Sequence, residues 1–130
     1  MEQTQIHLTE AEWKVMEFLW HRSPRTGRQA TDWMEEHMDW NRSTTLTLLR
    51  RLEEKGAVTI GHRGGIKQFK PALSRKEAVL QETGRFLSRV YHGSVSELVE
   101  TMAREEMLSP QELDALHLIV SRMEDTQHET

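Results

Sequence analysis

Short hydroxyl side chains and arginines gather in one stretch of the sequence, NRSTTLTLLRRLEEKGAV, residues 41–58. Serine and threonine are mediocre helix formers because their hydroxyls compete for backbone partners. The stretch nevertheless has helical periodicity, which predicts a buried stripe made of Thr45, Leu48, Leu49 and Leu52. The opposite face of this helix then carries Arg42, Ser43, Thr44, Leu46, Thr47, Arg50 and Arg51.

This opposite face has side chains suited to nucleic-acid recognition. A B-DNA major groove admits one α-helix, and the N-terminal residues of that helix read most of the bases. Short hydroxyl side chains allow a close approach, arginines reach phosphates or a guanine, and a threonine methyl or Leu46 can touch a thymine methyl. The alternative is that these residues only decorate a solvated helix face.

The charge distribution favours a local anionic partner. The 130-residue chain has a net charge of −4, yet residues 41–70 hold seven basic and two acidic residues, a net charge of +5. Residues 75–130 have a net charge of −5. A basic block on an acidic chain indicates a localised binding surface for an anion, although a solvated charged surface has the same composition.

Two further helices are expected before this stretch. Thr9 and Glu12 have the spacing of a capping box at the start of the first helix, which runs to about residue 22. Pro24 and Gly27 mark a connection, and residues 28–40 predict a shorter second helix. Asn41 is a good N-cap for the third, so the second and third helices meet through a short turn.

After Gly56 the period changes to that of a β-hairpin. Residues 57–63 and 66–73 are strand-like runs around Arg63-Gly64-Gly65, and the tip of the hairpin carries Arg63 and Lys67. Two helices joined by a short turn and followed by a hairpin with a basic tip predict a winged helix-turn-helix.

The C-terminal part predicts about three amphipathic helices over residues 75–123, with more apolar surface than so small a layer needs. Pairing with a second copy of the chain would bury that surface and place two recognition helices about 34 Å apart on a palindrome. A self-contained helical domain is the alternative. The expected dimer contacts are Phe86, Leu87, Val90, Leu98, Val99, Met102, Leu113, Leu116, Ile119 and Val120.

The predicted fold is therefore mostly α with a small β-hairpin wing. We expect a winged-helix DNA-binding domain over residues 1–73, a helical dimerisation domain over 74–124 and a disordered tail over 125–130. The chain has no cysteine, its seven histidines lack ligand spacing, and no catalytic constellation is present, so we expect no metal, no cofactor and no enzymatic activity. No apolar run approaches the roughly 18 residues needed to span a bilayer, and the N-terminus has no signal peptide, which predicts a cytoplasmic protein without membrane contact.

Several stretches resemble the penicillinase repressor family, the BlaI/MecI/CopY type: LTEAEWKVMEFLW, STTLTLLRRLEEKGAV, KQFKPALSRKEA, GSVSELV and LSPQELDAL. The similarity runs from about Leu8 to Met123. It implies a dimeric winged-helix repressor that binds inverted repeats, often with TACA/TGTA half-sites. The family's helix contacts then correspond to Arg42, Ser43, Thr44, Thr47 and Arg51.

The sequence departs from the family pattern in three ways. It has no C-x-C motif, which excludes the metal sensing of CopY-like members. The Asn-Phe bond cleaved in β-lactam-responsive members is replaced by Thr101-Met102. Leu46 stands where a polar residue is expected, which indicates a shifted half-site preference.

The leading hypothesis is a homodimeric repressor of double-stranded operator DNA, released by a signalling protease or another effector. The alternative is a winged-helix module that binds protein and has only weak, nonspecific affinity for DNA. The inducing signal, the operator sequence and the regulated genes are not encoded in these patterns.

Overall fold

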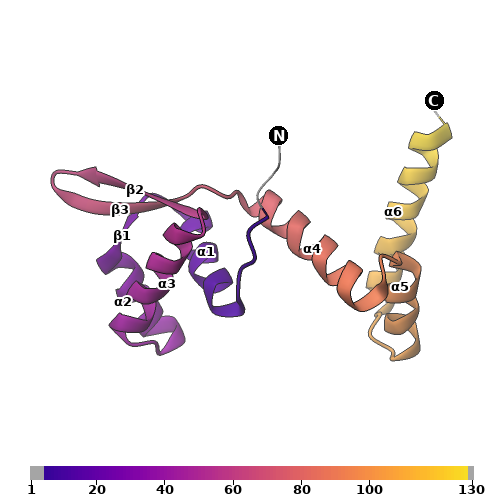
Figure 1. Cartoon of the computed structure of the whole chain (residues 1–130). Helices are drawn as coiled ribbons and strands as arrows, with labels where there is room; N and C mark the ends of the chain where they lie inside the picture. Colours follow the sequence, from indigo (N-terminus) through magenta and orange to yellow (C-terminus); the bar gives the residue numbers. More distant parts are fainter. Residues whose placement is uncertain (1–4, 129–130) are drawn as a thin grey trace. The chain divides into compact units, whose positions relative to one another are not determined.

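The computed structural model describes residues 5–128, and the chain divides into two compact units, Met1–Thr83 and Gly84–Thr130. Three helices and a small sheet make up the first unit, together with the start of a fourth helix (Figure 1). Its elements are α1 (Glu10–His21), β1 (Arg25–Thr26), α2 (Gly27–Met38), α3 (Arg42–Glu54), β2 (Val58–Arg63), β3 (Ile66–Pro71) and the first part of α4 (Arg75–Tyr91).

Side-chain caps fix where the first two helices begin. Thr9 Oγ1 accepts the Glu12 N–H at 3.2 Å, and Glu12 Oε1 accepts the Thr9 N–H at 2.8 Å, which confirms the predicted capping box of α1. A second capping box, formed by Thr26 and Gln29, starts α2 at Gly27. The second box was not predicted, and it sets the helix start one residue earlier than expected.

The core of the first unit lies between the three helices and the sheet. The predicted stripe of α3 is confirmed, since all four of its side chains are buried. The start of α4 contributes Ala78 to the same core. The core consists of Leu8, Val15, Met16, Phe18, Leu19, Ala30, Met34, Leu48, Leu49, Leu52, Ala57, Val58, Phe69, Leu73 and Ala78.

The predicted hairpin is confirmed, and its sheet has one strand more than expected. Gly64 and Gly65 turn the chain with φ values of +58° and +78°, a region that glycine enters without a Cβ clash. The strand order is β1-β3-β2, and β1 pairs Arg25 with Phe69. The segment between Pro24 and Gly27 was expected to be only a connection. A strand of two residues is too short to show a period in the sequence.

The second unit contains the end of α4, α5 (Val95–Arg104) and α6 (Pro110–His128). The expected helices are present, and Ser94 caps α5 by accepting the Glu97 N–H at 3.2 Å. The expected disordered tail is wrong for residues 125–128, because α6 continues to His128; residues 129 and 130 lie outside the described residues. In the described part of this unit, no side chain is buried.

Helix α4 begins in the first unit and ends in the second. The boundary expected after residue 73 coincides with the loop that precedes α4, between β3 and Arg75. A functional division at that point stays a prediction.

Candidate nucleic-acid interface

The start of α3 is organised around the side chain of Asn41. Its Oδ1 lies 2.9 Å from each of three donors, the backbone nitrogen of Thr44 and the hydroxyls of Ser43 and Thr44. An amide oxygen has only two lone pairs, so three donors compete for them. The two hydroxyls are therefore weakly held and can turn to an outside acceptor at little cost.

The face of α3 opposite the core holds the seven residues predicted from the sequence, here called the α3 face: Arg42, Ser43, Thr44, Leu46, Thr47, Arg50 and Arg51. All of them are exposed except Thr47, which is half-buried. One flank of the face is a shallow hollow of about 260 Å³. It is lined by Ser43, Thr44, Thr47, Leu48 and Arg51. This hollow brings together the three predicted hydroxyl side chains and one predicted arginine, Arg51.

The other flank of the α3 face meets the wing, the hairpin of β2 and β3. A groove of about 290 Å³ lies between them. Arg50 from α3 and Lys67 from β3 contribute cations to it, above apolar side chains that include Leu46. Its lining consists of Gly27, Leu46, Leu49, Arg50, Glu53, Ile60, Lys67 and Phe69.

Two predicted contacts lie outside both hollows. Arg63 is exposed at the turn of the wing, where it pairs with Ile66 in the strand register, and Arg42 is exposed at the first position of α3. Gly27, Ile60 and Phe69 were not predicted as part of the site. Gly27 reaches it because it directly follows β1, which pairs with β3, a pairing for which the sequence carries no local signal. Ile60 and Phe69 face each other in the register of the β2–β3 hairpin.

The cations of this surface have no acidic partners within residues 5–128. None of Arg42, Arg50, Arg51, Arg63 and Lys67 takes part in an ion pair there, whereas Arg28, Arg75 and Arg104 each pair with a carboxylate. Cations that form no ion pair are available to bind an anion, such as a phosphate, although Glu53 also lines the groove of Arg50 and Lys67.

A partly buried ion pair anchors the other end of α3. Lys55, the C-cap residue, donates to Glu12 Oε1 and, at 2.8 Å, to the backbone oxygen of His7. Glu12 is only 1% exposed. Burial alone raises the pKa of Glu12, but the hydrogen bonds from Lys55 and from Thr9 outweigh it and hold the pKa below its ordinary value. The carboxylate stays charged and ties α3 to α1.

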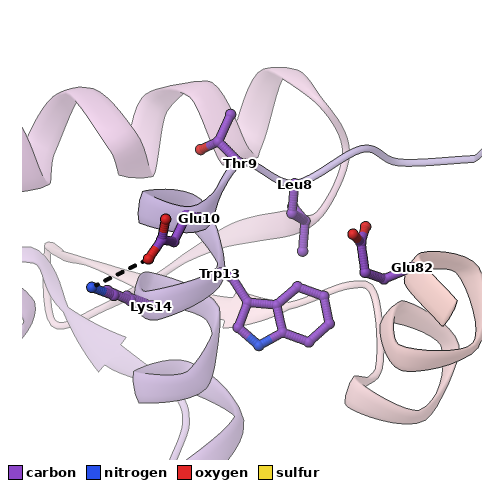
Figure 2. A pocket seen from close by; sticks show the side chains of 6 residues that line it. All are labelled: Leu8, Thr9, Glu10, Trp13, Lys14 and Glu82. Atoms are coloured by element: carbon purple, nitrogen blue, oxygen red, sulfur yellow. Dashed lines mark ion pairs between the residues drawn. The ribbon is translucent and has the colours of Figure 1, made fainter. Parts of the chain in front are cut away.

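A separate hollow of about 340 Å³ lies at the start of α1, and its lining residues all belong to the first unit (Figure 2). Leu8 and Trp13 form its apolar wall. Lys14 pairs with Glu10 at 4.0 Å, and Trp13 Nε1 donates to Glu17 at 2.9 Å. The hollow therefore offers mainly apolar surface, and no residue of the α3 face lines it.

The residues predicted for dimerisation carry partly or fully exposed apolar side chains. Phe86, Val90, Leu113, Ile119 and Val120 are exposed. Leu87, Leu98, Val99, Met102 and Leu116 are half-buried. The large exposed apolar residues of this unit's described part that were not predicted as contacts are Val95, Met107, Leu118 and Met123.

The described part of the chain holds neither a metal-binding cluster nor a membrane-spanning helix. Across residues 5–128, no three histidine or acidic side chains gather into a group that would hold a metal ion. Within the same residues, no helix combines the length and the apolar composition that crossing a membrane requires.

Comparison with known proteins identifies the family. The sequence of residues 8–122 matches the model of the penicillinase repressor family. The chain belongs to this family. The resemblance inferred from the sequence is thereby confirmed.

One relative of this penicillinase repressor family member is the methicillin resistance regulatory protein MecI of Staphylococcus aureus (strain N315). The two sequences are 25% identical over 122 residues, which cover 94% of this chain and 99% of MecI. The penicillinase repressor of Bacillus licheniformis is 24% identical over 122 residues, 94% of this chain and 95% of that protein. Both likenesses extend over almost the full length of each protein.

Solved structures confirm the winged-helix fold of the first unit. The solution structure of the DNA-binding domain of the repressor BlaI has a TM-score of 0.52 and 22% identity, covering 58% of this chain and 93% of that one. The monomeric form of Bacillus licheniformis BlaI in complex with the blaP half-operator has a TM-score of 0.50 and 24% identity, covering 55% and 87%.

Proposed function

We propose that this protein is a transcriptional repressor that binds inverted-repeat operators as a homodimer, with α3 in the major groove. The observation that carries the proposal is the α3 face, where hydroxyls and unpaired arginines stand on the exposed side of a helix whose other side is fully buried. The names of two relatives, a methicillin resistance regulatory protein and a penicillinase repressor, support the same function.

The geometry of α3 supports base reading by its first half. The short side chains at its start let the helix backbone approach the groove, and the weakly held hydroxyls can exchange Asn41 for a phosphate or a base edge. Arg50 and Arg51 lie further along the helix, one on each flank, where they can bind phosphates on opposite walls of the groove. Arg42 adds a third cation at the helix start.

The wing supports a further contact with the DNA backbone. Lys67 shares a groove with Arg50, so a phosphate can bind between two elements of the fold. Arg63 stands at the turn, where it can contact the next stretch of backbone. These contacts add affinity without reading sequence, and they position α3 in the groove.

The second unit supports dimerisation because its helices bury no side chain by themselves within the described residues. Apolar surface on this scale favours association, and a twofold pair matches an inverted repeat. The Thr101-Met102 bond lies inside α5, so a protease that cuts there has to unwind the helix first.

The experiment is a footprinting titration of the full-length protein on its own promoter region, with unrelated DNA as competitor. We expect a protected inverted repeat, bound about 10³-fold more tightly than competitor, with an affinity that falls steeply between 50 and 200 mM salt. Equal, weak binding to both DNAs overturns the proposal and favours a protein-binding winged helix instead.

Arg51→Ala tests the role of α3 directly. Loss of a charge-assisted phosphate or guanine contact predicts about a 10- to 100-fold weaker operator complex with an unchanged dimer. Arg104→Ala is the matched control, since it removes the same charge from an exposed arginine in the second unit, 68% exposed and paired with Glu100. Unchanged affinity of the Arg51 variant would remove that residue from the contact surface.

A further inference from the structure

Leu46 is an apolar side chain on the α3 face, whose other members are charged or carry hydroxyls. It is the fifth residue of α3 and is 41% exposed. Its exposed neighbours three and four positions away along the helix are Arg42, Ser43 and Arg50. A single exposed leucine is ordinary on a protein surface, but this one lies within the residues proposed to enter the major groove.

One methyl of Leu46 lies beside Gly27, the first residue of α2. A Cβ added at Gly27 would lie 3.6 Å from Leu46 Cδ2 and 3.6 Å from Phe69, so one methyl of the leucine packs close to the start of α2. The side chain also lines the groove between α3 and the wing. Leu46 therefore lies beside the start of α2 and the wing and still presents apolar surface to the outside.

The major groove of unmodified DNA contains one apolar group, the C5 methyl of thymine. A leucine cannot donate or accept a hydrogen bond, so it gains nothing from a guanine, adenine or cytosine edge and covers polar atoms that then lose water. Contact with a thymine methyl removes apolar surface of both partners from water. The chemistry of position 46 thus favours one base over the other three.

We propose that Leu46 determines operator specificity by contacting the C5 methyl of one thymine in each half-site. This inference rests on the proposed function and adds to it the chemical group that position 46 recognises. The competing explanation is that Leu46 only covers the apolar floor of the groove formed by Leu49, Ile60 and Phe69. That role affects stability and affinity but does not distinguish bases.

Deoxyuridine separates the two roles, because it pairs as thymine does and lacks only the methyl. Each symmetric pair of thymines in the protected operator is replaced in turn, and the full-length protein is titrated against each DNA. For the unaltered protein we expect one thymine position at which replacement weakens binding roughly fourfold per methyl, the ratio that corresponds to burying one such group. Leu46→Ala should bind thymine and deoxyuridine at that position equally well.

Two variants sharpen the assignment. Leu46→Met keeps an apolar side chain of similar reach, so it should keep the preference for thymine at that position. Thr47→Ser removes the other methyl group near the middle of the face and keeps its hydroxyl; it should also keep the preference, whatever its effect on overall affinity. Thermal unfolding verifies that each variant is folded.

The outcomes are distinct. A thymine preference that disappears only in Leu46→Ala supports the inference. Specific operator binding with no deoxyuridine penalty at any position, or a penalty that persists in Leu46→Ala, overturns the inference and leaves the repressor function standing. A penalty lost in Thr47→Ser assigns the methyl contact to Thr47 instead. Absence of specific binding by the unaltered protein refutes the proposed function, and this inference with it.

Discussion

Replacing Thr45 by valine should make the first unit more stable. Thr45 is fully buried on α3, and its Oγ1 has no hydrogen-bond partner among the described residues. An unsatisfied buried hydroxyl costs about 1–3 kcal/mol. Valine has nearly the same shape, is also branched at Cβ, and has a similar helix propensity. It replaces the hydroxyl by a methyl group that needs no partner.

We expect Thr45→Val to raise the free energy of unfolding by about 1–2 kcal/mol, which corresponds to an increase in Tm of roughly 5–10 °C for a unit of this size. The assay is urea unfolding followed by tryptophan fluorescence, because Trp13, Trp20, Trp33 and Trp40 all lie in the first unit. Operator affinity should not change, since Thr45 faces away from the α3 face.

Thr45→Ser is the matched control. It keeps the hydroxyl and removes the methyl, so it should lower the free energy of unfolding by about 1 kcal/mol. Opposite signs for the two variants identify the hydroxyl as the unfavourable group. A urea midpoint of Thr45→Val at or below that of the unaltered protein would refute the reasoning and indicate that the hydroxyl has a partner in solution, such as a buried water.

Three other perturbations test separate parts of the structure. The pKa of Glu12 is lower in the folded than in the unfolded protein, so its pair with Lys55 stabilises the fold at pH values above the ordinary carboxyl pKa. This stabilisation is lost as the pH falls through the folded pKa, and acid unfolding of Glu12→Gln should lack this component. Lys55→Met should lower the free energy of unfolding by roughly 2–4 kcal/mol at pH 7, measured by urea unfolding. Gly84 lies inside α4, and a Cβ added there would meet no atom within 4 Å. Gly84→Ala should therefore raise the free energy of unfolding by about 0.5–1 kcal/mol. A lower free energy of unfolding would indicate that a second copy of the chain packs against this position. Ile119→Asp should shift the protein to monomers in sedimentation analysis and weaken operator binding more than tenfold, whereas Ser121→Asp should not; a variant that still dimerises would remove Ile119 from the interface.

Local signals accounted for the helices and the wing. The spacing of Thr45, Leu48 and Leu52 fixed which side of α3 is buried, and the Thr9 and Glu12 pair fixed the start of α1. Each of these patterns lies within a segment of a few residues, the range over which helical periodicity and helix capping act. The residues predicted for the site on α3 followed from the same periodicity, because the exposed face of the helix lies opposite the buried stripe.

Contacts between distant parts of the sequence were not predictable in the same way. Lys55 and Glu12 are 43 residues apart, and nothing near either one indicates the other. The pairing of Arg25 with Phe69 likewise depends on how the fold closes. Gly27 was recognised only as a breaker, whereas its place beside Leu46 and the wing follows from the tertiary structure.

No side chain is buried in the described part of the second unit, so the proposed dimer would make protein concentration a folding variable. If the helices of this unit are stabilised only by a second copy, dilution removes the dimer and the order of the helices together. A newly made or diluted chain then exposes apolar segments to cellular proteases, while a paired chain is protected. We therefore expect the lifetime of the protein to rise with its own concentration. Operator occupancy should then increase more steeply with the rate of synthesis than it would if the lifetime of the protein were constant.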